Sequence, residues 1–332
     1  VWRNAYLCRM DREQFTALCN RWAGEGRPFL FAVDFEMEQF VAVETEHAAE
    51  EGILYDVSGQ TNVTSPPPPL PPDIVFDMTP VSRDRYDRAF SLVKKNIIHG
   101  NSFLLNLTFP TRLHTNLDPR QIFGHSVAPY RMLYRDRFVV FSPESFVKIR
   151  GRTIASYPMK GTIDAAVPDA EKRLLSDEKE QWEHNTIVDL IRNDLSMVAK
   201  EVRVKRFRYV DRVQTHRHAL LQVSSEVEGM LAADWRGRLG EILLTMLPAG
   251  SVSGAPKRKT VEIIRRAEGE KRGFFTGVFG LFDGRSVDSA VMIRFIEQKE
   301  GGLQFRSGGG ITGHSRAGAE YREMIDKVYL PL

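Results

Sequence analysis

Two acidic residues occupy unusual positions in the long helix that the sequence predicts over residues 176–199. When each residue advances the helix by about 100°, Glu183 and Asp194 fall inside the apolar stripe and not on the polar face. A buried carboxylate must be protonated, paired with a cation or bound to a metal ion. The positions therefore indicate either a structural salt bridge, for which Arg192 and Lys179 are close in sequence, or carboxylates that take part in chemistry.

A second acidic pair lies on the last predicted helix, over residues 316–328. Glu320 and Glu323 are three residues apart, as are Glu180 and Glu183 on the first helix, and residues at this spacing are neighbours on one helix face. Two such pairs could converge on one hard cation, since Mg²⁺ binds through one or two protein carboxylates, waters and an anionic substrate. The same spacing is common on solvated helix faces, so a purely structural interpretation stays open.

A lysine lies in a constrained turn within residues 157–162, where the strand predicted over residues 153–157 ends. Pro158 holds the preceding residue in an extended conformation, and Gly161 allows a ligand to approach the backbone closely. As a nucleophile, Lys160 would need a lowered pKa, because only about one lysine in 2,500 is neutral at pH 7. Burial or a nearby cation would supply that shift. The alternative is an ordinary surface charge.

Two glycine-rich segments could present backbone N–H groups to an anion. Gly308, Gly310 and Gly313 match the spacing of a dinucleotide-binding fingerprint, but too few residues follow them to complete a βαβ unit. The segment 250–257 lacks the spacing of a P-loop, but it leads into a helix that Pro256 can begin. Because helix N-termini bind anions, a carboxylate-bearing ligand would fit. Two tight turns are the alternative.

The order of predicted helices and strands around these candidate residues indicates an α+β protein. Tight turns join successive strands, so the sheets should be antiparallel. An antiparallel meander with a turn at Asp283-Gly284 is the clearest part of this pattern. We expect helices over residues 82–100, 176–199, from 256 onward and 316–328, and strands over 102–108, 138–141, 146–149, 153–157, 278–282, 287–298 and 303–306.

The proline-rich run over residues 65–72 predicts a stiff polyproline connector, with an SH3-type ligand as the alternative. It divides the chain into a short N-terminal segment over residues 1–72 and a main domain over residues 73–332.

Composition excludes several function classes. The 332 residues carry 46 Lys and Arg against 43 Asp and Glu, a net charge of +3. The densest basic run, residues 203–208, alternates with apolar residues as one solvated strand face does, so we expect no nucleic-acid partner. No apolar stretch reaches the roughly 18 residues of a membrane span. Two cysteines, Cys8 and Cys19, and no recognisable signal peptide predict a cytoplasmic protein.

Six motifs occur in a fixed order along residues 82–328: Phe141–Phe146, Pro158–Thr162, Glu183–Leu195, Pro248–Lys257, Gly308–Ile311 and Ala319–Glu323. In this order they resemble the chorismate-utilising enzymes, which include anthranilate synthase component I, aminodeoxychorismate synthase component I, and isochorismate and salicylate synthases. The resemblance implies antiparallel sheets packed as a sandwich that is flanked by helices.

By resemblance, the residue at position 160 distinguishes the subfamilies. Anthranilate and isochorismate synthases typically carry Ala at this position, whereas aminodeoxychorismate synthases carry Lys, as this chain does. By resemblance, Lys160 attacks C2 of chorismate and expels an allylic hydroxyl group, and ammonia then adds at C4 to give 4-amino-4-deoxychorismate. Glu144 matches the general acid/base. Glu183 and Glu323 match Mg²⁺ ligands, with Glu180 and Glu320 near the metal through water.

The positions that hold the two carboxylates of chorismate are also implied by resemblance. They are Gly161, Thr162, Ser251, Arg294, Gly308, Gly310 and Lys327, and Phe275 is a further substrate-binding position.

Three positions depart from the family pattern. Leu104 stands where isochorismate synthases have a water-activating Lys and amination enzymes usually have Gln, which disfavours addition of water. Gln222 replaces a His used in eliminating pyruvate, which fits a synthase without lyase activity. Phe275 replaces a substrate-binding Tyr and lacks its hydroxyl group.

The resemblance predicts an Mg²⁺-dependent aminodeoxychorismate synthase component I on the path to p-aminobenzoate and folate. Neither Cys8 nor Cys19 has the surroundings of an amidotransferase nucleophile, so we expect ammonia from a separate glutamine amidotransferase subunit or from solution. The alternatives are an anthranilate or isochorismate synthase of the same family and a non-catalytic relative that binds an anionic metabolite.

Overall fold

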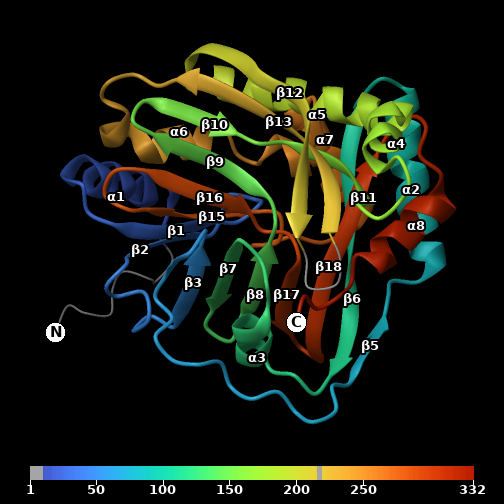
Figure 1. The fold of residues 1–332 in the computed structure, drawn as a ribbon, viewed down its shortest axis with the longest axis horizontal. Helices are drawn as coiled ribbons and strands as arrows, with labels where there is room; N and C mark the ends of the chain where they lie inside the picture. Colours follow the sequence, from blue (N-terminus) through green and yellow to red (C-terminus); the bar gives the residue numbers. More distant parts are fainter. Residues whose placement is uncertain (1–9, 215–218) are drawn as a thin grey trace.

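Two nine-stranded antiparallel sheets form the centre of the computed structural model, which describes residues 10–214 and 219–332 (Figure 1). The first sheet has the order β11-β13-β10-β9-β16-β15-β1-β2, with β12 paired to β13. Its strands are β1 (Phe29–Val33), β2 (Phe40–Glu44), β9 (Ser145–Arg150), β10 (Thr153–Ser156), β11 (Met159–Asp164), β12 (Lys200–Gln214), β13 (Ala219–Met230), β15 (Val278–Phe282) and β16 (Val287–Val291).

The second sheet has the order β14-β6-β18-β17-β8-β7-β3-β4, with β5 paired to β6. Its strands are β3 (Ile53–Val57), β4 (Gln60–Thr61), β5 (Phe76–Thr79), β6 (Leu104–Thr115), β7 (Tyr130–Tyr134), β8 (Phe138–Ser142), β14 (Gly254–Ala255), β17 (Phe295–Lys299) and β18 (Gly302–Ile311).

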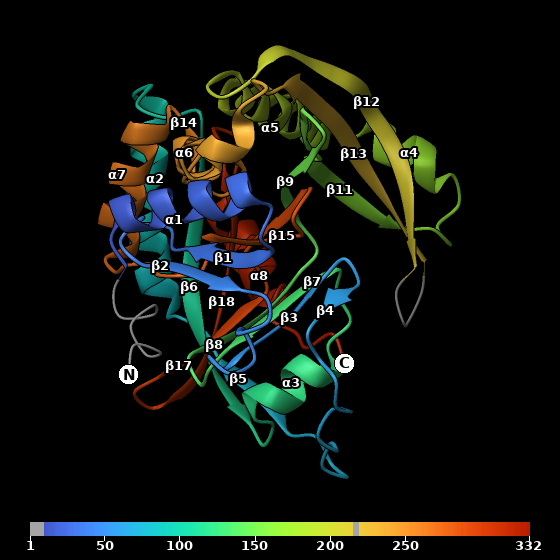
Figure 2. The ribbon, with the colours of Figure 1, turned by 90° about the vertical axis from the view of Figure 1, so that its left-hand side faces the viewer.

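Helices cover the outer faces of both sheets (Figure 2). Helices α1 and α6 pack beside β1 and β2, α3 covers β7 and β8, and α2, α7 and α8 cover β6 and β18. The helices are α1 (Arg12–Glu25), α2 (Arg83–Ile98), α3 (Pro119–His125), α4 (Ala170–Ser176), α5 (Glu178–Ser196), α6 (Leu239–Thr245), α7 (Lys257–Glu268) and α8 (Ala317–Asp326), with short 3₁₀ turns η1 (Trp235–Arg238) and η2 (Gly250–Val252).

Strand β1 shows how the sandwich is built. All of its side chains are buried, and successive side chains point to opposite faces of a sheet. Leu30 and Ala32 belong to the core between the two sheets, with Phe138 of β8. Phe29 and Phe31 belong to the core beneath the helices. The fold is therefore the α+β sandwich of antiparallel sheets with flanking helices that the resemblance implied.

Several predicted elements are confirmed, and one is wrong. Helix α2 begins after Ser82, whose side chain caps it by accepting a hydrogen bond from Arg85 N. The single strand predicted over residues 287–298 is two strands, since β16 lies in the first sheet and β17 in the second. The chain crosses between the sheets at Arg294, which has a φ of +54°. Residues 290–296 are apolar except for Arg294, so the sequence shows no break at this crossing.

Residues 10–72, the described part of the predicted N-terminal segment, contribute strands to both sheets. Strand β1 pairs with β15 and β3 pairs with β7, so these strands are parts of the same two sheets. The proline-rich run packs on α3 of its own chain: Gln121 Nε2 donates to Pro69 O at 2.7 Å, and His125 Nε2 lies 2.8 Å from Pro68 O.

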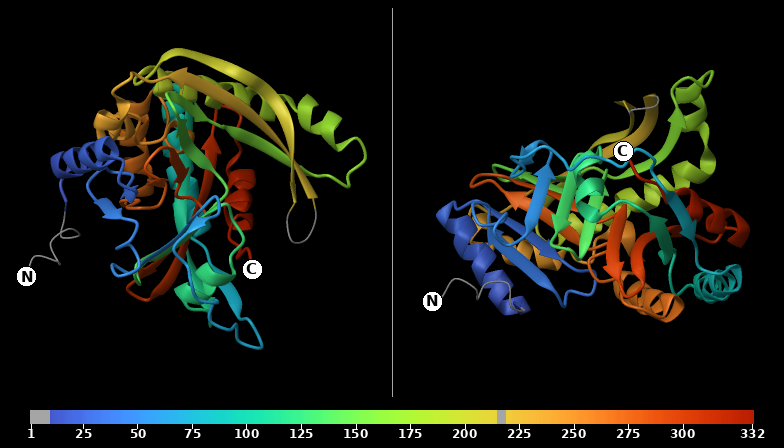
Figure 3. Two further views of the ribbon diagram at one scale, coloured as in Figure 1. Left: turned by 60° about the vertical axis from the view of Figure 1, so that its left-hand side comes forward. Right: turned by 90° about the horizontal axis from the view of Figure 1, so that it is seen from below.

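The long hairpin of β12 and β13 extends along one end of the molecule beside α4 and α5 (Figure 3). It contains the basic run that the sequence placed on one solvated strand face. Arg203 lies 2.7 Å from Glu228 and Lys205 lies 3.0 Å from Glu226 of the paired strand. The run is therefore matched by acidic residues.

Within the described residues, no helix is long and apolar enough to cross a membrane.

A buried arginine connects a strand of the second sheet, a 3₁₀ turn and a helix. The Arg272 side chain is 1% exposed and forms two hydrogen bonds with Glu268 of α7, at 2.6 and 2.9 Å. Its guanidinium also donates to Val252 O of η2 and to Asn106 O of β6. Glu268 in turn accepts a hydrogen bond from Thr108 N of β6. Strand β6, η2 and α7 are therefore fixed to one another by a single charged pair.

Replacing Arg272 with Met leaves Glu268 buried without its cation, so we expect the free energy of unfolding to fall by about 3–5 kcal/mol. Urea denaturation measures the loss. The control Arg83→Met breaks the exposed Arg83–Asp87 pair and should change the same quantity by about 0.5 kcal/mol or less. Equal losses in the two variants would contradict this role of Arg272.

Candidate active site

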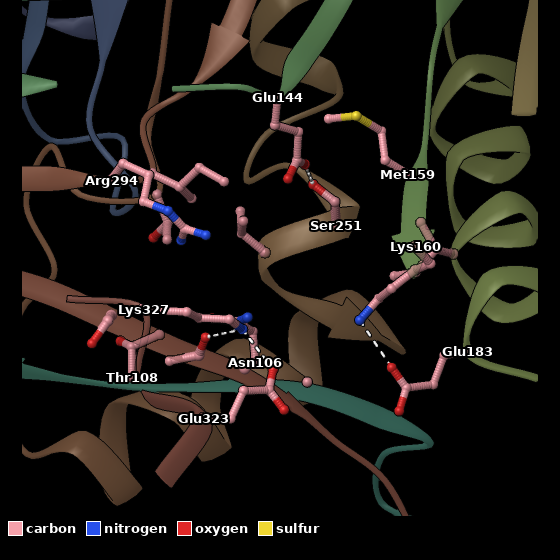
Figure 4. A pocket seen from close by; sticks show the side chains of 18 of the residues that line it. Asn106, Thr108, Glu144, Met159, Lys160, Glu183, Ser251, Arg294, Glu323 and Lys327 are labelled. Atoms are coloured by element: carbon pink, nitrogen blue, oxygen red, sulfur yellow. Dashed lines mark hydrogen bonds and ion pairs between the residues drawn. The ribbon is translucent and has the colours of Figure 1, made fainter. Parts of the chain in front are cut away.

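A cavity of about 400 Å³ lies where the two sheets meet α5 and α8 (Figure 4), a volume within the range of about 300–1,000 Å³ that is usual for ligand sites. All of the predicted site residues line it. They are Glu144, Lys160, Gly161, Thr162, Glu180, Glu183, Ser251, Phe275, Arg294, Gly308, Gly310, Glu320, Glu323 and Lys327.

A bulge in β11 aims Lys160 into this cavity. Lys160 pairs with Val223 of β13 and Thr162 pairs with Gln222, so Gly161 is an extra residue in the ladder. Gly161 has a φ of +78°, a conformation that glycine adopts without strain. Bulges bend a strand and redirect its side chains. The glycine that the sequence analysis associated with close approach therefore also sets the direction of Lys160.

The amine of Lys160 faces α5. Lys160 Nζ lies 2.9 Å from Glu183 Oε2. Burial acts to lower the pKa of Lys160, but Glu183, Glu180 and Glu323 together outweigh burial and raise it. The ammonium form therefore dominates in this state of the protein. Glu183, which the sequence placed inside the apolar stripe, has its cation in Lys160.

The other carboxylate in that stripe has a supporting role. Asp194 Oδ1 lies 2.7 Å from Lys257 Nζ, and its Oδ2 accepts a hydrogen bond from Gly250 N at 3.1 Å. Asp194 is thus the structural salt bridge that the sequence left open, with Lys257 as its partner. It fixes η2 and hence Ser251. The rest of the loop before α7 is not open to an anion, because Gly254 and Ala255 pair with β6.

Glu144 lies in the turn between β8 and β9, across the cavity from α5 (Figure 4). Ser251 Oγ donates a hydrogen bond to Glu144 Oε1 at 2.5 Å. Burial raises the pKa of Glu144, although Ser251, Lys160 and Arg294 act to lower it. A raised pKa favours the protonated carboxyl group, which can donate its proton to a leaving group.

Gly308 and Gly310 of the predicted loop at residues 308–313 lie in strand β18, and Gly313 lies in the turn that follows it. Gly308 faces Thr108 and Gly310 faces Asn106 in the pairing of β18 with β6. Thr108 N donates to Glu268 and Asn106 N donates to Ser253 O, so these two pairs do not exchange backbone hydrogen bonds.

The backbone groups of Gly308 and Gly310 therefore point away from β6, and β17 ends before it reaches them. Gly308 O accepts a hydrogen bond from Lys327 Nζ at 2.9 Å. The N–H groups of these glycines are left facing the cavity.

Besides Lys160 and Arg306, two further cations line the cavity. Arg294 stands at the crossing from β16 to β17. Lys327 follows α8 and contacts Glu323 Oε1 at 2.7 Å. Burial lowers the pKa of Lys327, and Glu323 acts against this change. The two cations and the inward N–H groups can bind carboxylates of a ligand.

Three of the four glutamates of α5 and α8 lie close to two glycines of the cavity. A Cβ atom at Gly309 would lie 3.3 Å from Glu323 Oε1 and 3.7 Å from Glu320 Oε2. A Cβ atom at Gly161 would lie 3.4 Å from Glu180 Oε2. Carboxylate oxygens of α5 and α8 line the cavity, and carboxylate oxygens are the ligands that Mg²⁺ prefers in proteins.

The three positions that depart from the family pattern differ in their placement. Gln222 and Phe275 line the cavity. Leu104 is buried in a hydrophobic core, and its Cδ1 would lie 3.1 Å from a Cβ atom at Gly310. Its apolar side chain provides no group that could activate water.

The sequence analysis missed several polar residues that also line the cavity. The periodicity of β6 contains a signal for two of them, since polar Asn106 and Thr108 recur at every second position among apolar residues. The missed residues are Asn106, Thr108, Thr276, Arg306 and Ser307.

Comparison with known proteins shows the family. Residues 17–332 match the chorismate binding enzymes. An uncharacterized PabA-like protein of Haemophilus influenzae is 50% identical over 98% of this chain and 99% of its own length. Aminodeoxychorismate synthase component 1 of Bacillus subtilis is 30% identical over 75% of this chain, which spans 55% of that enzyme.

A solved structure supports the fold independently. MenF, the menaquinone-specific isochorismate synthase of Escherichia coli, aligns with 97% of this chain and 82% of its own, with a TM-score of 0.74 and 17% identity. At this identity the likeness concerns the fold alone. Together with the match over residues 17–332, these findings show that the chain belongs to the chorismate-utilising enzyme family.

Proposed function

We propose that this protein aminates chorismate with ammonia to give 4-amino-4-deoxychorismate, with Lys160 as a covalent nucleophile. The observation that carries the proposal is that the Lys160 amine and the Glu144 carboxyl group line one cavity together with Arg294 and Lys327. The cations suit the two carboxylates of chorismate. The similarity to aminodeoxychorismate synthase component 1 of Bacillus subtilis supports the same reaction.

In the first step, Lys160 Nζ in its neutral form attacks C2 of chorismate. The product bears its amino group at C4 in place of the hydroxyl group, so the bond that breaks is the C4–O bond. Glu144 donates the proton with which the hydroxyl group leaves as water. The result is a protonated secondary amine between Lys160 and C2, with Glu144 as a carboxylate.

In the second step, ammonia attacks C4 and the C2–Nζ bond breaks. Lys160 leaves as a neutral amine, and the new amine at C4 carries one extra proton. Return of that proton to Glu144 restores both side chains. Atoms and charge therefore balance over the two steps without an oxidant or reductant.

The first step requires a neutral amine, whereas the carboxylates around Lys160 raise its pKa. Glu180, Glu183, Glu320 and Glu323 would hold magnesium, which when bound neutralises carboxylate charge and attracts an anionic substrate. Burial of Lys160 then acts in the direction that nucleophilic attack needs.

The proposal places the protein in the cytoplasm on the route to p-aminobenzoate and folate. Ammonia comes from solution or from a separate glutamine amidotransferase subunit. Among the described residues, the free cysteine is Cys19, which is buried and has a raised pKa because of that burial. These properties do not suit a glutaminase nucleophile.

Replacing Lys160 with Ala should abolish amination, because the covalent route loses its nucleophile. The assay combines chorismate, Mg²⁺ and ammonium chloride, and mass spectrometry identifies the product. Lys148→Ala is the matched control: Lys148 is also a partly buried lysine paired with an acid, Asp288 at 3.0 Å. That variant should keep its activity.

Three results would count against the proposal. Full amination by Lys160→Ala would exclude the covalent route. Anthranilate or isochorismate as the product of the unaltered protein would assign it to another branch of the family. Binding of chorismate without turnover, even with ammonia present, would indicate a non-catalytic relative.

Replacing Ser251 with Ala removes a hydrogen bond that lowers the pKa of Glu144, so that pKa should rise. If Glu144 must be protonated to act, activity is lost as pH rises through this pKa. The alkaline limb of kcat/KM for chorismate, measured with saturating ammonia, should therefore move to higher pH. Ser251→Thr keeps the hydroxyl group and serves as the control. A limb that stays in place in Ser251→Ala would exclude Glu144 as the acid.

A further inference from the structure

Asn106, a polar residue of β6, has no partner within the protein for its side-chain oxygen. The residue lines the cavity, and its Oδ1 atom is buried without a hydrogen bond. Buried acceptors are rarely left unpaired, because removal from water is unfavourable unless a donor replaces it. The orphaned oxygen therefore indicates that a ligand supplies the donor.

The position of Asn106 places this oxygen beside the reactive amine. Asn106 lies directly opposite Gly310 in the pairing of β6 with β18, and side chains of directly opposed residues share one face about 4.5–5.5 Å apart. A Cβ atom at Gly310 would lie 3.9 Å from Lys160 Nζ. The carboxamide thus neighbours the place where the C2–Nζ bond forms and breaks.

The backbone of Asn106 is held in place through both its N–H and its carbonyl group. Its N–H donates to Ser253 O at 3.1 Å, and its carbonyl oxygen accepts from Arg272 at 2.7 Å. The side chain therefore projects from a fixed point. Leu104, the preceding residue on the same face, is apolar and offers no hydrogen bond.

Two hydroxyl groups of the cavity are already engaged with acidic side chains of the protein. Ser251 donates to Glu144 and the Thr108 hydroxyl donates to Glu268. Charged groups suit the carboxylates and the leaving hydroxyl group of chorismate. Asn106 adds an uncharged hydrogen-bond acceptor to the cavity. Such an acceptor suits a small, uncharged hydrogen-bond donor, and ammonia is the reactant with these properties.

We propose that Asn106 Oδ1 accepts a hydrogen bond from the incoming ammonia and orients it for attack on C4. One N–H bond of ammonia points to the carboxamide, and the lone pair stays free to form the C4–N bond. No proton moves to Asn106. This inference rests on the proposed amination and adds a residue that selects and positions its second reactant.

The variants Asn106→Leu and Asn106→Asp test the role of the oxygen. Leu removes the acceptor at similar size, so KM for ammonia should rise by about ten-fold, the effect of one lost hydrogen bond. KM for chorismate should stay unchanged. Asp keeps an acceptor oxygen and should restore a KM for ammonia near that of the unaltered protein. Asn101→Leu, at an exposed asparagine outside the cavity, is the control.

Steady-state rates are measured with each reactant varied in turn, and thermal melting shows that each variant folds. An unchanged KM for ammonia in Asn106→Leu would overturn the inference, as would a rise in KM for chorismate instead. Failure of Asp to restore ammonia use in a folded variant would also overturn it. If the unaltered protein forms no aminated product, the proposed function itself fails, which is a separate and distinguishable result.

Discussion

The ion pair between Lys160 and Glu183 controls the chemical state of the cavity. Burial alone favours a neutral lysine, but the acidic residues of α5 and α8 reverse that preference and keep the amine charged. The proposed chemistry therefore depends on whatever neutralises those carboxylates, and a divalent cation with an anionic substrate would do so. Lysine reactivity and metal binding are two aspects of one charge balance in this account.

Several backbone features exist to maintain that balance. The bulge at Gly161 points Lys160 at α5, and the crossing at Arg294 brings a cation to the cavity from between the sheets. Asp194 and Lys257 fix the turn that carries Ser251. The pair of Arg272 and Glu268 then holds β6 and η2 behind these groups. The charged groups of the site are thus positioned by a bulge, a crossing and a turn. Paired charges next to these backbone features hold them in place.

Sequence patterns predicted local elements well and long-range pairing poorly. The cap at Ser82 and the apolar stripe of α2 are visible in the sequence because both are local. The crossing at Arg294 is hidden because apolar residues continue on both sides of it without a turn signal. Gly308 and Gly310 resemble part of a loop in sequence and form a strand only because β6 lies beside them. Pairing of β1 with β15 joins residues too distant in the chain for any local pattern to reveal.

The residues of the site were predicted mainly from the ordered motifs. The ion pairs among them were not predicted. Helical periodicity marked Glu183 and Asp194 as misplaced, but only the structure assigns Lys160 to the first and Lys257 to the second. Asn106 was missed because a single asparagine in a strand has no distinctive spacing. Its role depends on a missing hydrogen-bond partner, and a sequence does not contain that information.

The most direct test of the account is intact-mass analysis of the protein incubated with chorismate and Mg²⁺ in the absence of ammonia. The account predicts an adduct with the mass of chorismate less one water, which peptide mapping assigns to Lys160 and which added ammonia releases. An unmodified Lys160 under conditions in which amination proceeds normally would contradict the central claim.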